Sequence, residues 1–480
     1  MRGLGDWARA LVSRGDEQEP PVGLDHRSLA AFRIAFGVVL LTNLATRSYG
    51  GRFEAHYTET GVLPLGLVPR FGPRWSFLDA FSDPVAAKVG FALIAAVYLA
   101  YTLGLFTRLM QVLVVACLLS LYHRNPLLDD GSDWVMRFFA IWTAFLPLGD
   151  RFSLDLRWRK KLRRGGLHHS FAMWAFIANL GVSYFLNSYQ KDGISWGEGT
   201  ALRYVMWDPW TVSPVAASMR RALGDGPIWV LTKLPLLVEY ILAAGVLFAP
   251  FSRHIKRVVV VLMLGLHLAF ASFLFIGSFS FLYVSCAFMF IPSEDWERLG
   301  IEDAPQRRPR PLWRRGLVTG LAVVWALFAG YELVQRNYRV SRPVKAVAAL
   351  VAPWLEPVHV FLMVPQEWFM FRAPSPYQEV TVVEAVAADG TRYDPFRPGP
   401  FDLHRPIHES AHVGKYWVSY LVRLSRPGFD RYRSALARYL EARGATAVTI
   451  HLLKLDAPST RDGEPTKIRD EIVFTTANRR

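Results

Sequence analysis

Six ionisable side chains lie within or beside long apolar stretches of the sequence, where a charge is costly. They are Arg33, Asp133, Arg137, Lys191, Glu239 and His267. In membrane segments such groups line a cavity, pair with one another or take part in chemistry. Loss of water favours the uncharged form of an amine, so Lys191 beside a dry cavity could act as a general base. Glu239 and His267 lie on the next two apolar segments, which indicates one shared polar site.

The same residues also have structural interpretations. Arg33 and Arg137 can form ion pairs that hold neighbouring helices in register. Their candidate partners are Asp25, Asp133 and Glu239. His267 alone can be a hydrogen-bonded packing residue, and Lys191 can extend its amine toward the lipid headgroups. The sequence leaves the catalytic and the structural interpretations open.

Long apolar blocks must position these groups. The 480 residues are 52% hydrophobic and 14% aromatic, and the blocks are long enough to cross a bilayer. We predict about nine transmembrane helices. They lie near 29–47, 86–106, 108–122, 134–149, 170–188, 228–250, 257–275, 278–292 and 316–335. Both cysteines, Cys117 and Cys286, fall inside such blocks, which excludes a disulfide framework.

Basic residues gather in a few loops between the apolar blocks. The formal net charge is +15, and Lys and Arg cluster in 151–164, 253–257 and 307–315. With about nine spans and a cytoplasmic N-terminus, all three loops are cytoplasmic, as the positive-inside rule requires. No basic face interleaved with aromatic residues occurs elsewhere, so we expect no nucleic-acid partner.

The sequence changes character in its last third. Val380–Val386 and Ala447–Leu455 resemble strands, Asp389-Gly390 is a hairpin signal, and Tyr432–Ala442 has the pattern of an amphipathic helix. We therefore predict a mainly α fold, a polytopic transmembrane helical bundle with a small C-terminal extracytoplasmic α+β domain. The predicted parts are a cytoplasmic segment, 1–24, a transmembrane domain, 25–338, and the extracytoplasmic domain, 339–480.

The histidines give no metal signature. His404, His408 and His412 would share one face of a helix and could then bind a metal. Pro406 and Gly414 oppose a regular helix there. We therefore predict no metal site.

A series of short motifs runs through most of the apolar blocks. The first leads from Asp25 through Arg33 to Gly37. The others are Tyr57-x-x-x-Gly61-x-x-Pro64, Leu103–Arg108, Asn125 with Gly131-x-Asp133, Tyr184-Phe185 with Lys191, Trp196 and Glu198-x-x-x-Leu202, His267 with Phe275–Phe279, and Gln366–Pro374. In type and order they resemble the HTTM family of vitamin K-dependent γ-carboxylase-like membrane proteins. The resemblance covers residues 25–300 well and 360–395 loosely.

The resemblance implies a membrane enzyme with two coupled reactions. In that family a lysine removes a proton from reduced vitamin K, and oxygen then adds. The strong base that results takes a γ-proton from a protein glutamate, carbon dioxide adds, and the quinone ends as its epoxide. Carried over, Lys191 would be the base and His267 its polar partner. The residues expected around the substrates are Arg33, Tyr57, Asn125, Asp133, Arg137, Tyr184, Trp196 and Glu239.

The same resemblance implies cofactors, partners and a location. The cofactor would be reduced vitamin K or a related quinol, with oxygen and carbon dioxide as co-substrates. The partners would be the lipid bilayer, the lipophilic quinone and an exported protein or peptide. The match to the bacterial forms of the motifs indicates a bacterial inner membrane, with the C-terminal domain in the periplasm. A water-poor site would protect so strong a base from quenching.

The chain departs from the animal enzyme at several positions. Gln190 stands where that enzyme has a second lysine, and Asp192-Gly193 follows where it has an apolar residue. Asp133 lies near the place of a histidine, and the C-terminal region shows no propeptide-binding segment of the animal type. These departures bear on the protein-glutamate substrate more than on the quinone chemistry.

Two non-enzymatic functions stay open. The bundle could be a scaffold or carrier whose outer domain binds a partner, so that substituting Lys191 or His267 would alter stability but no chemistry. The half-to-half similarity of many transporters is not visible in the sequence. The protein could also be a membrane-bound folding factor for exported proteins.

Overall fold

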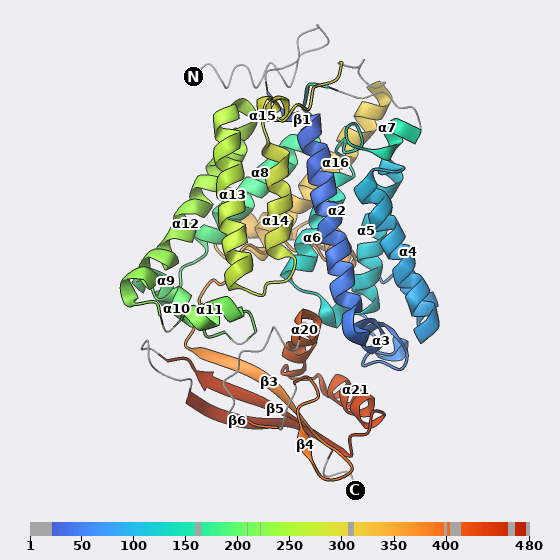
Figure 1. Ribbon diagram of the computed structural model, residues 1–480, viewed down its shortest axis with the longest axis vertical. Helices are drawn as coiled ribbons and strands as arrows, with labels where there is room; N and C mark the ends of the chain where they lie inside the picture. The colour runs from blue at the N-terminus through green and yellow to red at the C-terminus, as the bar shows by residue number, and fades with distance from the viewer. Residues whose placement is uncertain are drawn as a thin grey trace.

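The computed structural model describes residues 22–158, 165–208, 210–220, 222–305, 312–397, 401–403, 414–458 and 466–476. Most of these residues form a bundle of long helices, and a small β-sheet lies beyond one end of it (Figure 1). The bundle helices are α2 (His26–Ser48), α4 (Pro84–Leu103), α5 (Thr107–Arg124), α6 (Gly131–Thr143), α8 (Phe171–Tyr189), α12 (Asp225–Phe248), α13 (Arg253–Phe273), α14 (Phe279–Ala287) and α16 (Leu312–Arg336).

Shorter elements connect the bundle helices. The helical ones are α3 (Arg52–Tyr57), α7 (Leu154–Trp158), α9 (Ile194–Glu198), α10 (Ala201–Val205), α11 (Pro214–Met219) and α15 (Ser293–Arg298). The 3-10 turns are η1 (Tyr49–Gly51), η2 (Leu65–Leu67), η3 (Phe77–Phe81), η4 (Pro126–Leu128), η5 (Ala249–Phe251) and η6 (Phe288–Phe290). Two short antiparallel strands, β1 (Leu24–Asp25) and β2 (Leu167–His168), join the start of α2 to the start of α8.

Polar side chains fix where the bundle helices begin. Asp25, Ser170 and Ser252 cap α2, α8 and α13 by accepting hydrogen bonds from backbone N–H groups of the first turn. The tight turn from α4 to α5 places Gly104 in the left-handed region. Asp155 closes this turn, since its carboxylate accepts from the N–H groups of Phe106 and Thr107 at 2.9 Å each.

The connections place successive helices in opposite directions, so the bundle has two distinct ends. At one end the start of α2 meets the start of α8 and the end of α12, where Gly23 donates to the carbonyl of Pro250. At the other end Asn43, near the end of α2, donates to Ser278 before α14. The described parts of the basic loops 151–164, 253–257 and 307–315 lie at the first end, and the β-sheet lies at the second (Figure 1).

Every segment predicted to cross the membrane is helical, but fewer helices meet the length and hydropathy expected of a span. Among the described residues five helices do so, namely His26–Tyr57, Pro84–Leu103, Asp225–Phe251, Arg253–Phe273 and Leu312–Arg336. Polar residues lower the hydropathy of α5 and α8, whereas α6 and α14 are short, with 13 and 9 residues. Because α6 is almost wholly buried among other helices, it needs no lipid-compatible surface. Nine crossings therefore remain a prediction.

The C-terminal region contains the predicted strands, hairpin and helix. Its antiparallel sheet has the order β4-β3-β5-β6, from β3 (Tyr377–Val386), β4 (Arg392–Tyr393), β5 (Ala447–Asp456) and β6 (Thr466–Thr475). The hairpin between β3 and β4 turns at Gly390, which has a φ of 86°. Helices α20 (Lys415–Leu424) and α21 (Asp430–Glu441) pack on the sheet, and α20 lies between the sheet and the bundle (Figure 1).

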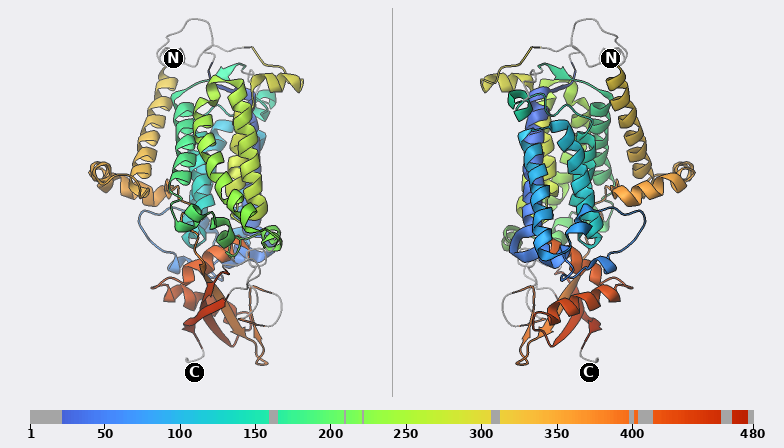
Figure 2. Two further views of the ribbon diagram at one scale, coloured as in Figure 1. Left: turned by 90° about the vertical axis from the view of Figure 1, so that its left-hand side faces the viewer. Right: turned by 90° about the vertical axis from the view of Figure 1, so that its right-hand side faces the viewer.

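Two helices that the sequence analysis did not predict follow α16. They are α17 (Arg342–Ala349) and α18 (Ala352–Leu362), with an 88° bend between them. In Figure 2 these gold-to-orange helices run sideways from the bundle, above the sheet. The region predicted as one outer domain from residue 339 thus begins with helices that adjoin the bundle, and its first strand starts at Tyr377.

Two predictions about cysteine and metal can be compared with the structure. Cys117 and Cys286 are both free and buried, as expected from their apolar surroundings. His404, His408 and His412 lie outside the described residues. Within the described ranges, no group of three or more His, Cys, Asp or Glu residues has the geometry to hold a metal ion.

Candidate functional site

A small enclosed cavity lies where α8, α12 and α13 meet the segment that leads to the sheet. Its volume is about 80 Å³. Polar lining comes from Ser183, Tyr184, Asn187, Lys191, Thr232, Glu239 and His267. Aromatic lining comes from Trp196, Phe270, Phe279, Tyr283, Trp368 and Phe371. The predicted convergence of one ionisable group from each of three successive segments is thus present.

Lys191 and Glu239 form a buried ion pair at this cavity. The Lys191 Nζ lies 2.9 Å from Glu239 Oε1 and 2.8 Å from Oε2, and the two side chains are only 4% and 2% exposed. Asn187, two residues before the end of α8, donates to Glu239 Oε1 at 2.7 Å. The Nζ also lies 5.2 Å from the ring centre of Trp196. The sequence analysis placed Lys191 and Glu239 in one polar site, and the structure shows that the two form an ion pair there.

Tyr184 and His267 form a second polar pair in the same cavity. Tyr184 Oη lies 2.8 Å from His267 Nε2, and the imidazole stacks on Tyr283 with a centroid distance of 4.6 Å. His267 Nδ1 is buried and has no hydrogen-bond partner among the described residues. If Tyr184 donates, Nδ1 carries a hydrogen and is a donor; in the other tautomer it is an acceptor. Either way, one imidazole nitrogen is left to bind a ligand.

Local sequence features position the lysine and the glutamate. The residue before Lys191, Gln190, ends α8 and donates both to Asn337 and to the carbonyl of Trp368, at 2.8 Å each. Pro235 lies one turn before Glu239 inside α12 and lacks the N–H that would bind the carbonyl of Leu231. Lys191 therefore follows a helix end that the hydrogen bonds of Gln190 hold in place. Glu239 lies one turn after a proline that interrupts the backbone hydrogen bonds of α12.

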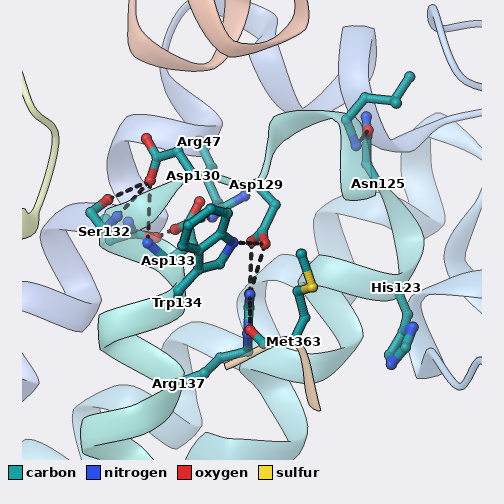
Figure 3. A network of polar contacts seen from close by, with 12 residues as sticks. Arg47, His123, Asn125, Asp129, Asp130, Ser132, Asp133, Trp134, Arg137 and Met363 are labelled. Carbon is teal, nitrogen blue, oxygen red and sulfur yellow. Dashed lines mark hydrogen bonds and ion pairs between the residues drawn. The ribbon is translucent and has the colours of Figure 1, made fainter. Parts of the chain in front are cut away.

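A second group of polar residues lies at the end of the bundle nearest the sheet, and it includes the predicted residues Tyr57, Asp133 and Arg137; Figure 3 shows part of this group. We refer to Arg47, Tyr57, Asp129, Asp133 and Arg137 as the docking cluster. Arg47 donates to Tyr57 Oη at 2.6 Å and to Asp133 Oδ1 at 2.7 Å. The guanidinium of Arg47 also lies 4.2 Å from the ring centre of Tyr416 in α20. This group thus links α2, α6 and the C-terminal region.

Arg137 and Asp129 form the other half of the docking cluster. Their two parallel hydrogen bonds are both 2.7 Å long, the fork geometry that guanidinium and carboxylate favour. Arg137 also donates to the carbonyl of Met363, which follows α18, at 2.7 and 3.0 Å. Trp134 donates to Asp129 at 2.6 Å (Figure 3). Arg137 therefore pairs with Asp129, not with the Asp133 on its own helix face.

Helix α20 seats its first residue beside the docking cluster. Lys415 contacts Ser132 and Asp130, with an Nζ–Oδ2 distance of 2.9 Å for Asp130. Burial alone would lower the pKa of the Lys415 ammonium, but the carboxylates of Asp130 and Asp133 outweigh burial and raise the pKa. Gly277 makes room for this lysine, since a Cβ there would lie 2.4 Å from Nζ. The ion pair of Lys415 with Asp130 therefore links the C-terminal domain to the helical bundle.

Two other predicted site residues lie away from the cavity. The guanidinium of Arg33 donates to backbone carbonyls at the opposite end of the bundle, including that of Leu148 at 2.6 Å. Its candidate partner Asp25 instead pairs with Arg27 at 2.7 Å. Asn125 donates to the carbonyl of His56 at 2.8 Å. These contacts hold loops against helices.

The cavity and a larger crevice share a wall. The crevice, about 1220 Å³, runs between the bundle and α20, and Asp129 of the docking cluster lines it. The wall common to both consists of Leu274, Ile276, Phe279, Met370 and Phe371. A movement of these side chains would join the two spaces.

Three residues of the two groups had no place among the sequence-predicted site residues. Arg47 closes the first apolar block, so the cost of polar groups in lipid could have marked it. Asp129 and Tyr283 give no such signal. Asp129 lies in a loop, and Tyr283 faces the cavity only because α14 packs beside α13.

The lining suits a quinol chemically, but the closed cavity is small. A hydroxyl of such a ligand could contact the Lys191 amine or the free His267 nitrogen, and the aromatic walls suit a flat ring. A volume of about 80 Å³ is below the 300 Å³ or more of ordinary ligand sites. The shared wall at Met370 and Phe371 must therefore move to admit a ring.

Comparison with known proteins gives one match. A family model, the HTTM domain, matches residues 23–296, which is more than half of the chain and includes α2 through α15 up to Trp296. The match includes the cavity residues Lys191, Glu239 and His267 and ends before the sheet. No curated protein and no solved structure matches the chain.

Proposed function

The chain belongs to the HTTM family, and from this premise we propose that it is an integral membrane enzyme resembling vitamin K-dependent γ-glutamyl carboxylase. It would act on a reduced quinone at Lys191 and add carbon dioxide to a glutamate of an exported protein or peptide. The single observation that carries the proposal is the buried Lys191–Glu239 pair, in one cavity with a histidine that has a free nitrogen.

In this proposal Glu239 makes Lys191 usable as a base. An ammonium must lose its proton before it can accept another, and Glu239 lies within 2.9 Å of it on both carboxylate oxygens. Transfer of the proton from Lys191 to Glu239 leaves a neutral amine beside a neutral acid, which a water-poor site tolerates better than separated charges. Lys191 then accepts the proton of a ligand hydroxyl.

The remaining cavity residues orient and enclose the ligand. His267 binds a ligand oxygen through Nδ1 while Tyr184 holds the ring orientation through Nε2. Trp196 and Tyr283 form flat walls, and the shared wall keeps water of the crevice out when closed. A bound quinol would supply the oxygen-derived base that removes the γ-proton of glutamate, and it would leave as the epoxide.

We propose that the sheet faces the periplasm of a bacterial inner membrane. The basic loops 151–164, 253–257 and 307–315 belong to the opposite end of the bundle, which supports a cytoplasmic location for that end. The crevice would then be open to exported substrates on the periplasmic side.

The test is an assay of quinol epoxidation and carbon dioxide incorporation with purified protein in nanodiscs. We expect Lys191→Ala to lose both activities, a fall of about 10²-fold or more, because a positioned general base contributes about that much. Lys88→Ala, which removes an exposed lysine of α4 that lines neither the cavity nor the crevice, is the matched control. A parent without either activity would refute the enzyme proposal, and an active Lys191→Ala would refute the role of Lys191.

The large crevice supports a second candidate, a folding factor or carrier for exported polypeptides. At about 1220 Å³ it is large enough for several residues of an extended chain. This function predicts that Lys191→Ala binds an exported client as well as the parent does. Equal capture of the same periplasmic protein by both, with no activity in either, would favour it.

A further inference from the structure

The bent pair α17–α18 carries an apolar face that no part of the described chain covers. Val347, Leu350 and Trp354 are 69%, 71% and 72% exposed, and Val344 and Val358 are also exposed. Val344 and Val347 are three residues apart on α17, Leu350 lies at the bend, and Trp354 and Val358 are four residues apart on α18, so each helix has an exposed apolar side. We refer to these five side chains as the apolar stripe. We refer to α17 and α18 together as the elbow.

The other side of the elbow is tied to the last turns of α16. Arg336 pairs with Glu356 at 2.8 Å, and Glu332 binds His359 at 2.8 Å in a buried contact. Tyr331 donates to Glu356 at 3.3 Å. These contacts fix which face of α18 points to the bundle, so the apolar stripe must point outward.

The geometry excludes a straight membrane crossing by the elbow. The bend is 88°, and the helices have 8 and 11 residues, which corresponds to lengths of about 12 and 17 Å. Each is shorter than the hydrocarbon core of about 30 Å. Figure 2 shows both running sideways from α16, and therefore across the direction of the bundle helices.

The surface next to the elbow indicates what covers the stripe. Leu317, Leu321, Val324 and Leu327 form an exposed apolar stripe along α16, with exposures of 54–69%. The elbow follows at the end of this surface nearest the sheet, where Phe361 and Met363 contact His123 and Arg137. Exposed Arg342 precedes the stripe and Trp354 lies within it, a combination typical of a helix at the lipid headgroups.

We propose that the elbow lies in the plane of the membrane, in the interfacial layer on the side of the sheet domain, with its stripe in the acyl chains. Lipid is the occupant because the stripe continues the apolar surface of α16. The chain leaves the elbow at Met363 and reaches the cavity wall at Met370 and Phe371, so the elbow anchors the wall of the cavity to the bilayer surface. This proposal does not depend on an enzymatic function.

Fluorescence quenching in nanodiscs tests the depth of the elbow. Leu350→Cys in the full chain is labelled with bimane, and nitroxide-bearing lipids act as quenchers at two depths. Both native cysteines are buried, and the labelled parent measures any background from them. The matched control is Ile472→Cys, an apolar residue of β6 that is 59% exposed. The folded state of both variants is checked by gel filtration.

We expect the label at residue 350 to lose about half of its fluorescence or more to nitroxides near the headgroups, and less to nitroxides at the bilayer centre, because interfacial helices lie about 5–10 Å deep. The control at residue 472 should not respond to either. Stronger quenching from the bilayer centre would overturn the proposal in favour of a re-entrant loop. If nitroxide lipids do not quench the label at residue 350, the proposal is also wrong. This holds whether or not the labels of two copies of the chain contact each other.

Discussion

The cavity at Lys191 and the docking cluster both bury ion pairs between helices, but they are built differently. In the docking cluster, Arg137 and Asp129 satisfy each other through two parallel bonds, and Met363 accepts from the remaining N–H groups. At the cavity, a lysine meets a carboxylate beside empty space, and His267 keeps a free nitrogen. The same cost of burying charge is therefore met in one place by an arginine–aspartate pair with two parallel bonds, and in the other by a pair that lies beside a cavity.

The residue types agree with this difference. Arginine has a rigid planar fork that does not lose its proton in proteins, which suits a permanent tie between segments. Lysine carries a compact charge that can be lost when water is excluded, which suits proton transfer. This difference fits a structural role for Arg47 and Arg137 and the catalytic role proposed for Lys191.

The largest expected effect is on the docking cluster. Arg137→Ala leaves Asp129 buried without its partner and should lower the free energy of unfolding by about 3–5 kcal/mol. The loss of stability is measured from the midpoint of thermal unfolding of the parent and the variant in nanodiscs. Arg339→Ala removes a partly exposed partner of Asp192, with a side chain 32% exposed, and should cost less than about 1 kcal/mol. Equal losses for the two variants would contradict the assignment of Arg137 to a structural role.

A smaller effect is expected at the Lys191–Glu239 pair, where the cavity leaves room for water. Lys191→Met and Glu239→Leu should each cost about 2 kcal/mol, and the double variant should cost less than either, because removing both charges leaves none unpaired. None of the three should retain quinol-dependent activity. Thermal unfolding of the four proteins gives the double-mutant cycle, and additive losses would show that the two residues are not coupled.

The sequence predicted the helical segments because long apolar blocks are local features. It also predicted β3, β5 and α21 from alternation and helical periodicity. It did not predict α17 and α18, since both are short, contain proline and gain their place from the contacts of Glu356 and His359 with α16. Whether α5, α6, α8 and α14 cross a bilayer depends on how the other helices surround them, which the sequence alone does not state.

The partners of the buried charges were less predictable than their presence. The sequence marked Lys191, Glu239 and His267 as members of one site, and all three line the cavity. It offered Asp133, on the same helix face, as a candidate partner of Arg137. The long side chain of Arg137 instead reaches the preceding loop, where it pairs with Asp129. Arg33 donates to backbone carbonyls, whereas its candidate partner Asp25 pairs with Arg27. Partner choice follows from the tertiary packing, which spacing does not encode.

The smallest expected effect concerns Asp192, the neighbour of Lys191 in sequence. It lies outside the cavity, where Arg339 and Arg372 flank its carboxylate at 3.0 and 3.1 Å. Hydrogen bonding from Tyr338 and from these arginines lowers the pKa of Asp192 to about 2, from an ordinary value of 3.8. Because the folded-state pKa is the lower one, the carboxylate stabilises the fold above about pH 4, and this contribution is lost as the pH falls toward 2.

Asp192→Asn should therefore destabilise the protein at pH 6 by about 1 kcal/mol or less, since the side chain is 26% exposed and solvent screens the pairs. The difference from the parent should shrink as the pH is lowered from 5 to about 3, which thermal unfolding at several pH values measures. A difference that stays constant with pH would mean that Asp192 acts through its shape and not through its charge.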